Sequence, residues 1–444
     1  MGGKLDSTLA HTLHLFSTCF LTVMMNMRIL RAALLMSLVL ASLWHTAHAK
    51  PNSRAAANTA ANLAKQNANG FDAEARLIAV YQRIGQAQTR EALSLADKLV
   101  ADYPNFALAQ LVHGDLLTAQ TRPLRAMGDM PEATARSAPG VLSELREESL
   151  LRIKALRERP PAGMVPAQFL QLPARNKHAI AIDASRSRLY VFENSSTGMK
   201  VVADYYISVG KLGIEKNTEG DLRTPLGVYF ITNTLDRKTL KDFYGAGALP
   251  INYPNPYDLR RGKTGGGIWL HGTPTGQFSR APKSTDGCVV LSNHDLKRIL
   301  ATTEIRTTPV VIAPSLQWVT PTQTATQYKA FDSLWAQWHR AKTSGDIARA
   351  LDFYTPDFNS YGKSLKDWTA VLGSEIAAAR GRDVQIKDLS ALYWAEPGQT
   401  ATMVVTFAEV VAGKTTGPTK RQYWLRSPSS TGNQWKIFFE GVIG

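Results

Sequence analysis

The chain has 444 residues, 44% of them hydrophobic and 20% charged, with a formal net charge of +15. This length is enough for two or three domains, each with its own core. A basic balance suits nucleic acid, an anionic membrane or an acidic polymer as partner. Because no zinc-ligand spacing, phosphate loop or basic-aromatic recognition motif is present, we expect no nucleic-acid partner, no metal and no cofactor.

Residues 1–49 have the features of an export signal. Arg28 and Arg31 follow Met27, an apolar segment comes next, and Ala-His-Ala at 47–49 supplies a small-x-small cleavage site. We therefore expect translation to start at Met27 and the mature protein to be periplasmic; an uncleaved amphipathic anchor is the alternative. The apolar segment is shorter than the about 20 residues of a spanning helix, and no later segment approaches that length.

A linker and a helical segment are predicted next. Residues 50–70 are rich in Ala and Asn, which is typical of a linker. Apolar residues recur at helical spacing within 71–160, where EALSLADKLVADYPNFALAQLVHGDLL resembles a tetratricopeptide-like hairpin. Residues 141–159 predict one charged helix that ends before two prolines. Since a single hairpin cannot bury its own apolar face, we expect it to pack on the next domain, as a scaffold or lid, or on an envelope protein partner.

Short apolar runs separated by turns follow in residues 177–313 and predict a mostly β domain, sandwich or barrel-like, with small helices. The predicted strands are 179–183, 189–193, 201–209, 227–232 and 309–313. A loop-rich insertion at 249–257 is expected to line a binding cleft.

Two candidate catalytic residues lie in this domain, seventeen positions apart. His271 ends one strand-like run, and Cys288, the only cysteine beyond the leader region, opens another. Taken singly, each residue type is more often structural than catalytic. A nearby imidazole can, however, convert a thiol into a thiolate nucleophile. Gly287 allows an unusual turn, and its amide and that of Cys288 are candidate donors to an oxyanion.

These motifs resemble the L,D-transpeptidase (YkuD-like) family. The family's motif is a His, a spacer and then Ser/Thr-His-Gly-Cys, and it is similar here to HGT, a loop and STDGCVVLSN. The family's approach strand is similar to RTPLGVYF, and its opening hairpin is similar to IAIDASRSRLYVFE. The resemblance implies that Cys288 is the acyl-accepting nucleophile, His271 its base and the Gly272 carbonyl the third element. Asp286 stands where His is commonest, and Val290 where Asn or Arg is usual. An acid at 286 is similar to the YafK-like branch, which is associated with hydrolysis and amide cleavage as well as cross-linking.

The resemblance also implies a substrate class, the stem peptides of peptidoglycan. Arg223 and Arg280 are candidates to pair with substrate carboxylates, and Trp269 and Thr285 are candidate substrate contacts. Because an anion opposes thiolate formation, we expect Asp286 to point away from the thiol, toward Arg280 or a backbone amide. Transfer to an amine is the favoured reaction. Hydrolysis as a carboxypeptidase or amidase, and a non-catalytic envelope scaffold, are the alternatives.

A second linker, at 314–326, and a third domain, at 327–444, complete the chain. Helices are predicted at 328–343 and 364–379, followed by strands at 384–394, 400–411, 420–427 and 435–442. This order resembles the NTF2/SnoaL-like α+β cone, which also follows the transpeptidase unit in some cell-shape-determining L,D-carboxypeptidases. The predicted fold is therefore multidomain: a mostly β catalytic domain between a helical segment and an α+β cone.

Overall fold

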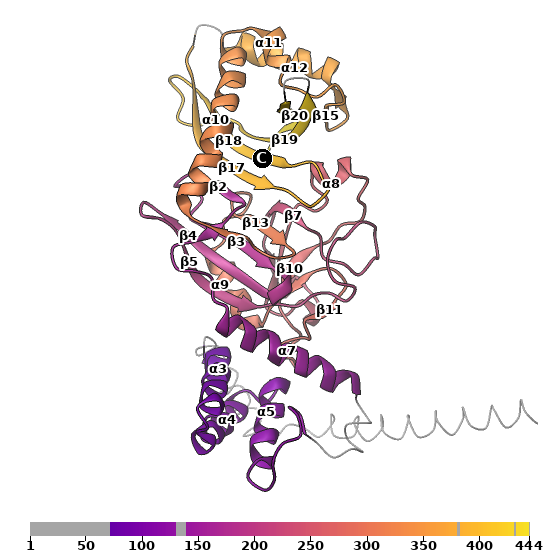
Figure 1. The fold of residues 1–444 in the computed structure, drawn as a ribbon. Helices are drawn as coiled ribbons and strands as arrows, with labels where there is room; N and C mark the ends of the chain where they lie inside the picture. The colour runs from indigo at the N-terminus through magenta and orange to yellow at the C-terminus, as the bar shows by residue number, and fades with distance from the viewer. Residues whose placement is uncertain (1–71, 130–138, 380–381, 430–431, 444) are drawn as a thin grey trace, which may run out of the picture. The chain divides into compact units, whose positions relative to one another are not determined.

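The computed structural model describes residues 72–129, 139–379, 382–429 and 432–443. The predicted leader, with its signal peptide, and the 50–70 linker lie outside these ranges. Helices, a mostly β region and an α+β region follow one another in the predicted order (Figure 1). None of the helices in the described ranges is long and apolar enough to cross a membrane.

The N-terminal segment is helical, as predicted. Its described helices are α3 (Asp72–Gly85), α4 (Thr89–Asp102), α5 (Ala107–Thr118) and α7 (Pro139–Arg157). Leu77, Leu99 and Phe106 form part of its core and are at most 1% exposed. The charged helix predicted at 141–159 is α7, and its buried positions include Glu148 and Arg152. The tetratricopeptide-like resemblance stays a prediction.

Two sheets form the mostly β catalytic region. The first has the order β5-β4-β3-β13-β7, with β13 parallel to β3 and antiparallel to β7. The second has the order β12-β10-β9-β8. Their bounds are β3 (His178–Asp183), β4 (Arg188–Ser195), β5 (Gly198–Tyr206), β7 (Gly227–Phe230), β8 (Leu235–Asp236), β9 (Gly247–Pro250), β10 (Trp269–His271), β12 (Val289–Val290) and β13 (Pro309–Ala313). Both sheets contribute to one core. The prediction of a mostly β domain is confirmed.

Shorter elements connect these sheets. The strand predicted at 201–209 is divided: β5 ends at Tyr206, and the separate strand β6 (Val209–Gly210) pairs with β11 (Lys283–Thr285). The remaining elements are η1 (Ala184–Arg186), η2 (Arg237–Thr239), η3 (Asp242–Tyr244), α8 (Pro256–Arg260) and α9 (Asn293–Thr302). The 249–257 insertion contributes to a cavity of about 690 Å³, which residues of the C-terminal domain also line.

The C-terminal domain places a curved sheet against helices. Its elements are α10 (Pro321–Thr343), α11 (Ile347–Leu351), α12 (Leu365–Ala379), β15 (Asn359–Ser360), β16 (Lys363–Ser364), β17 (Val384–Trp394), β18 (Thr402–Val411), β19 (Thr419–Ser429) and β20 (Gly432–Val442). Side chains alternate across its strands, so Leu392 and Val404 join the catalytic core while Ala391 and Met403 join the core beneath α10. The sheet therefore packs on both neighbours.

Two features differ from the sequence-based expectation. The predicted 314–326 linker overlaps α10, because Thr320 and Gln323 form a capping box and Pro321 occupies the first turn. The segment before the catalytic domain is also not a simple connection. Its strand β1 (Val165–Pro166) pairs with β14 (Trp318–Val319). Its strand β2 (Phe169–Gln171) adds to the edge of the C-terminal sheet, beside β17.

Candidate active site

The pairing of β10 with β12 brings His271 and Cys288 together. The two strands are parallel, with Leu270 opposite Val289. Extending this register by one residue places Cys288 opposite Trp269. Because side chains alternate along a strand, Cys288 and His271 lie on one face of the sheet. Leu270 and Val289 point to the other face, where both are fully buried.

His271 is held as a neutral imidazole. Its ring is buried, 1% exposed, and Nδ1 lies 2.7 Å from the carbonyl oxygen of Gly272. Since a carbonyl can only accept, Nδ1 carries the proton and Nε2 keeps its lone pair. Burial lowers the pKa of His271 to about 4, against a smaller upward effect of the Gly272 carbonyl. The Gly272 carbonyl, which the family resemblance implies as the third element, thus fixes the proton on Nδ1 and leaves the Nε2 lone pair to take a proton.

Aromatic side chains cause much of this burial. Phe243 and Tyr244 of η3 lie with ring centroids 5.7 and 5.1 Å from that of His271. Tyr244 also packs against Trp269, at 4.8 Å. Trp269 therefore belongs to the wall around the imidazole and is only partly exposed. Sequence reasoning missed Phe243 and Tyr244, because no local pattern indicates that η3 lies beside β10.

Cys288 is partly exposed, and its thiol is neutral at rest. The S–H group donates to the carbonyl of Gly267, at 3.5 Å. Burial raises the pKa of the thiol, while the backbone N–H of Trp269 and the positive charge of Arg280 lower it. The site thus pairs a neutral thiol with a neutral imidazole, and a nucleophilic attack by this thiol would require a proton transfer at the same time.

The turn before Cys288 depends on glycine. Gly287 has a φ of +126°, and a Cβ there would lie 2.7 Å from the carbonyl oxygen of Arg223. Thr285 is 2% exposed; its hydroxyl donates to the Cys288 carbonyl at 2.7 Å and accepts from the Gly287 amide at 3.1 Å. Thr285 therefore shapes the turn, and its buried hydroxyl does not favour the predicted substrate contact.

This turn also bears on the oxyanion donors. The Gly287 amide is committed to Thr285, so it is not the free donor that the sequence analysis expected. None of the hydrogen bonds found among the described residues uses the Cys288 amide. The Cys288 amide is therefore the donor best placed to meet an oxyanion.

Charged side chains surround the thiol. Asp286 is 67% exposed and pairs with Lys211 at 2.9 Å, so its partner is Lys211 rather than the expected Arg280 or a backbone amide. The Arg280 guanidinium lies 4.6 Å from the ring centroid of Phe243. Arg223 donates to a backbone carbonyl at 2.9 Å. Within the described residues neither arginine pairs with a carboxylate, and both keep donors for a ligand.

A separate cavity of about 930 Å³ lies in the C-terminal domain and not beside Cys288. Lys342, Lys420 and Glu409 line it, and both lysines pair with the glutamate, at 2.6 and 2.9 Å. In the ranges that the structure describes, no three His, Cys, Asp or Glu side chains are grouped to hold a metal ion.

Comparison with known proteins agrees with this geometry. Residues 177–312 match the YkuD family, the L,D-transpeptidase catalytic domain. The chain carries an L,D-transpeptidase catalytic domain. Residues 330–441 match the Cds6 C-terminal NTF2-like domain, so an NTF2-like domain follows the transpeptidase domain. The resemblances of the sequence to the L,D-transpeptidase family and to the NTF2-like fold are confirmed.

Two solved structures are similar to parts of this chain. Bd1075 from Bdellovibrio bacteriovorus is similar over 63% of this chain and 98% of its own, with a TM-score of 0.52 and 24% identity. The helical cell shape determining protein Pgp2 from Campylobacter jejuni is similar over 66% and 99%, with a TM-score of 0.48 and 21% identity. At 24% identity, the likeness to Bd1075 is one of fold. No curated protein matches the chain.

Proposed function

We propose that this protein is a periplasmic L,D-transpeptidase that acts on the stem peptides of peptidoglycan. One observation carries the proposal. Within an L,D-transpeptidase catalytic domain, a partly exposed thiol and an imidazole with a free Nε2 lie on one face of the same pair of strands. The export features of residues 1–49 and the net charge of +15, which suits an anionic envelope, support the location.

The proposed reaction begins with Cys288. Its sulfur attacks the carbonyl carbon of the L-linked diacid residue of a stem tetrapeptide, while Nε2 of His271 takes the thiol proton. The Cys288 amide would donate to the resulting oxyanion, and such a donor is typically worth about 2.7–4 kcal/mol. The C–N bond then breaks, His271 returns the proton to the nitrogen of the leaving D-alanine, and a thioester remains on Cys288.

The acceptor of the thioester decides the product. An amine of a second stem peptide would yield a cross-link, and water would yield a shortened peptide, as a carboxypeptidase or amidase does. Arg280 and Arg223 are proposed to pair with substrate carboxylates, because charge-assisted pairs are the stronger hydrogen bonds. An envelope protein partner for the helical segment or the NTF2-like domain stays a prediction.

Purified muropeptides test the proposal. The mature protein is incubated with tetrapeptide muropeptides, with and without an amine acceptor, and the products are separated by liquid chromatography and mass spectrometry. We expect cross-linked products with the amine, and none with Cys288→Ala, which should fold normally. Shortened peptides alone would identify a hydrolase. Unchanged turnover by Cys288→Ala would exclude the thioester mechanism, and the absence of any turnover would favour a scaffold.

A further inference from the structure

The loop between the base and the nucleophile is held by the N-terminal helices. Phe278 stacks on Phe106 of the helical core, with centroids 4.2 Å apart and planes inclined by 29°. It also meets Tyr103 edge-on, at 5.7 Å. Phe106 and Tyr103 are buried. The tip of this catalytic-domain loop therefore completes the core of another part of the chain.

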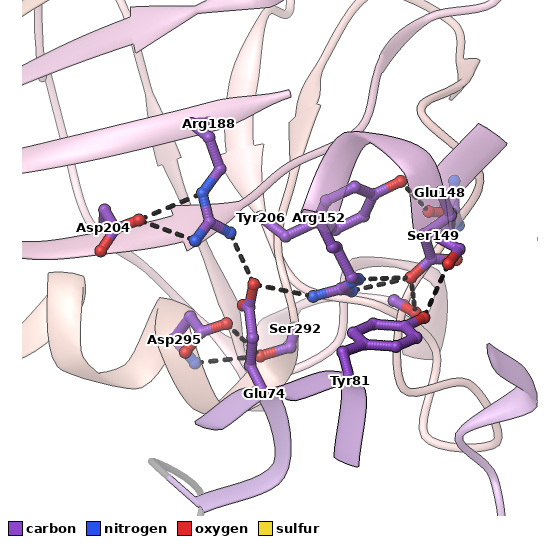
Figure 2. A network of polar contacts seen from close by, with 12 residues as sticks. Glu74, Tyr81, Glu148, Ser149, Arg152, Arg188, Asp204, Tyr206, Ser292 and Asp295 are labelled. Carbon is purple, nitrogen blue, oxygen red and sulfur yellow. Dashed lines mark hydrogen bonds and ion pairs between the residues drawn. The ribbon is translucent and has the colours of Figure 1, made fainter. Parts of the chain in front are cut away.

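Ser279, the residue after Phe278, also binds the N-terminal helices. The hydroxyl of Ser279 donates to Glu148 of α7 at 2.9 Å, and Arg152 binds the same carboxylate at 2.7 Å. The Arg152 guanidinium lies 4.0 Å from the ring centroid of Tyr206. The Tyr206 hydroxyl donates to the Arg280 carbonyl at 2.9 Å. Figure 2 shows the buried part of this network, with Glu148, Arg152 and Tyr206 side by side.

The anchored loop carries Arg280 to the active site. Its guanidinium lies over the Phe243 ring, which itself packs against His271. The charge of Arg280 acts on both reacting groups, since it lowers the pKa of Cys288 and of His271. The other charges that act on the thiol are those of Asp286 and Lys216.

We propose that Phe278 and Ser279 are positioning residues, which anchor the loop in the N-terminal helices and so hold Arg280 beside the thiol and the imidazole. The helical segment is then part of the catalytic apparatus and not only a scaffold. That the positioned guanidinium takes a carboxylate of the substrate rests on the proposed function. The positioning itself does not.

Alkylation of Cys288 tests the positioning without any substrate. The rate of reaction with iodoacetamide is followed from neutral to alkaline pH, with Cys288→Ala as the blank. Arg280→Ala removes a positive charge, so the thiol titration should move to higher pH and alkylation at pH 7 should slow by about threefold. Phe278→Ala should also slow alkylation at pH 7. Phe278→Leu keeps part of the apolar contact and should therefore retain most of the wild-type alkylation rate.

A double-variant cycle separates positioning from general destabilisation. In the Arg280→Ala background, Phe278→Ala should not shift the pH of the thiol titration any further, because the effect of Phe278 acts through the Arg280 guanidinium. A further shift of the same size would overturn the proposal. Tyr81→Phe is the matched control: it removes the 2.8 Å hydrogen bond from Tyr81 to Ser149 within the same helices and should leave alkylation unchanged. If Phe278→Ala fails to fold, Ser279→Ala, which removes one hydrogen bond, replaces it in the cycle.

Turnover of muropeptides then tests the substrate contact. Phe278→Ala and Arg280→Ala should both raise KM several-fold with a smaller change in kcat, because a binding charge is displaced or removed. An equal loss of kcat with unchanged KM would contradict the carboxylate contact. A wild-type protein that turns over no muropeptide would end the proposed function, while the alkylation cycle would still decide whether the helices position Arg280.

Discussion

Burial of His271 and Cys288 determines how the pair is protonated before substrate binds. The pKa of His271 is lowered to about 4, and that of Cys288 is raised above its ordinary value. Both shifts oppose transfer of the thiol proton to the imidazole, because burial disfavours the charged form of each group. The resting pair is therefore a neutral thiol and a neutral imidazole, and not a thiolate–imidazolium pair.

Replacing His271 by Ala should thus lower turnover without changing the alkylation rate of Cys288, whereas an ion-pair mechanism would lower both. The iodoacetamide rate of the wild-type protein should rise in a single titration on the alkaline side of the ordinary thiol range, and His271→Ala should follow it within about twofold, because no imidazolium is lost. Turnover of the same variant should fall by about 10²–10⁴, the usual contribution of a general base. Both rates are measured over the same pH range, with circular dichroism as the check on folding.

An alkylation rate that is already high and flat between about pH 5 and 8 would refute this reasoning, because it would report a thiolate stabilised by imidazolium. A large fall in the alkylation rate of His271→Ala at neutral pH would do the same. In either case the buried, neutral state of the ring would have to be abandoned, together with the role of Nε2 as a general base.

Three further predictions concern stability. Gly287→Ala should lower the free energy of unfolding by about 1–3 kcal/mol and remove most of the turnover, because its Cβ would meet the Arg223 carbonyl at a left-handed φ. Thermal unfolding measures the first effect, and a muropeptide assay measures the second. Burial raises the pKa of Glu74, but Arg188, at 2.6 Å, helps lower it to about 2. Glu74→Gln should therefore lower the free energy of unfolding by about 3–5 kcal/mol at neutral pH, as measured by urea unfolding. The difference from wild type should shrink as the pH falls from 4.5 toward 2, where Glu74 itself becomes protonated. His271 should also contribute a fall of about 3 kcal/mol in the free energy of unfolding from pH 6.5 to 4, because over this range its imidazole binds a proton only in the unfolded chain; His271→Asn should lose this contribution, measured as the difference from wild type at each pH.

The local sequence alone predicted those helices and strands whose own residues have a clear apolar or charged pattern. The apolar run Pro309–Ala313 is β13, and the charged run at 141–159 is α7. The candidate pair was also visible in the sequence, because His271 and Cys288 stand in a recognisable motif. The linker prediction failed at Thr320, where a proline in the first turn starts a helix instead of preventing one.

The chemical state of the pair was decided only by the tertiary structure. Burial by Phe243 and Tyr244 and the hydrogen bond to Gly272 keep His271 neutral, and the aromatic segment lies well apart from it in the sequence. In the same way, Phe278 gives no sign in the sequence that it completes a distant helical core. Local patterns report which residues are apolar or reactive, but desolvation and charge depend on which distant segments pack around them.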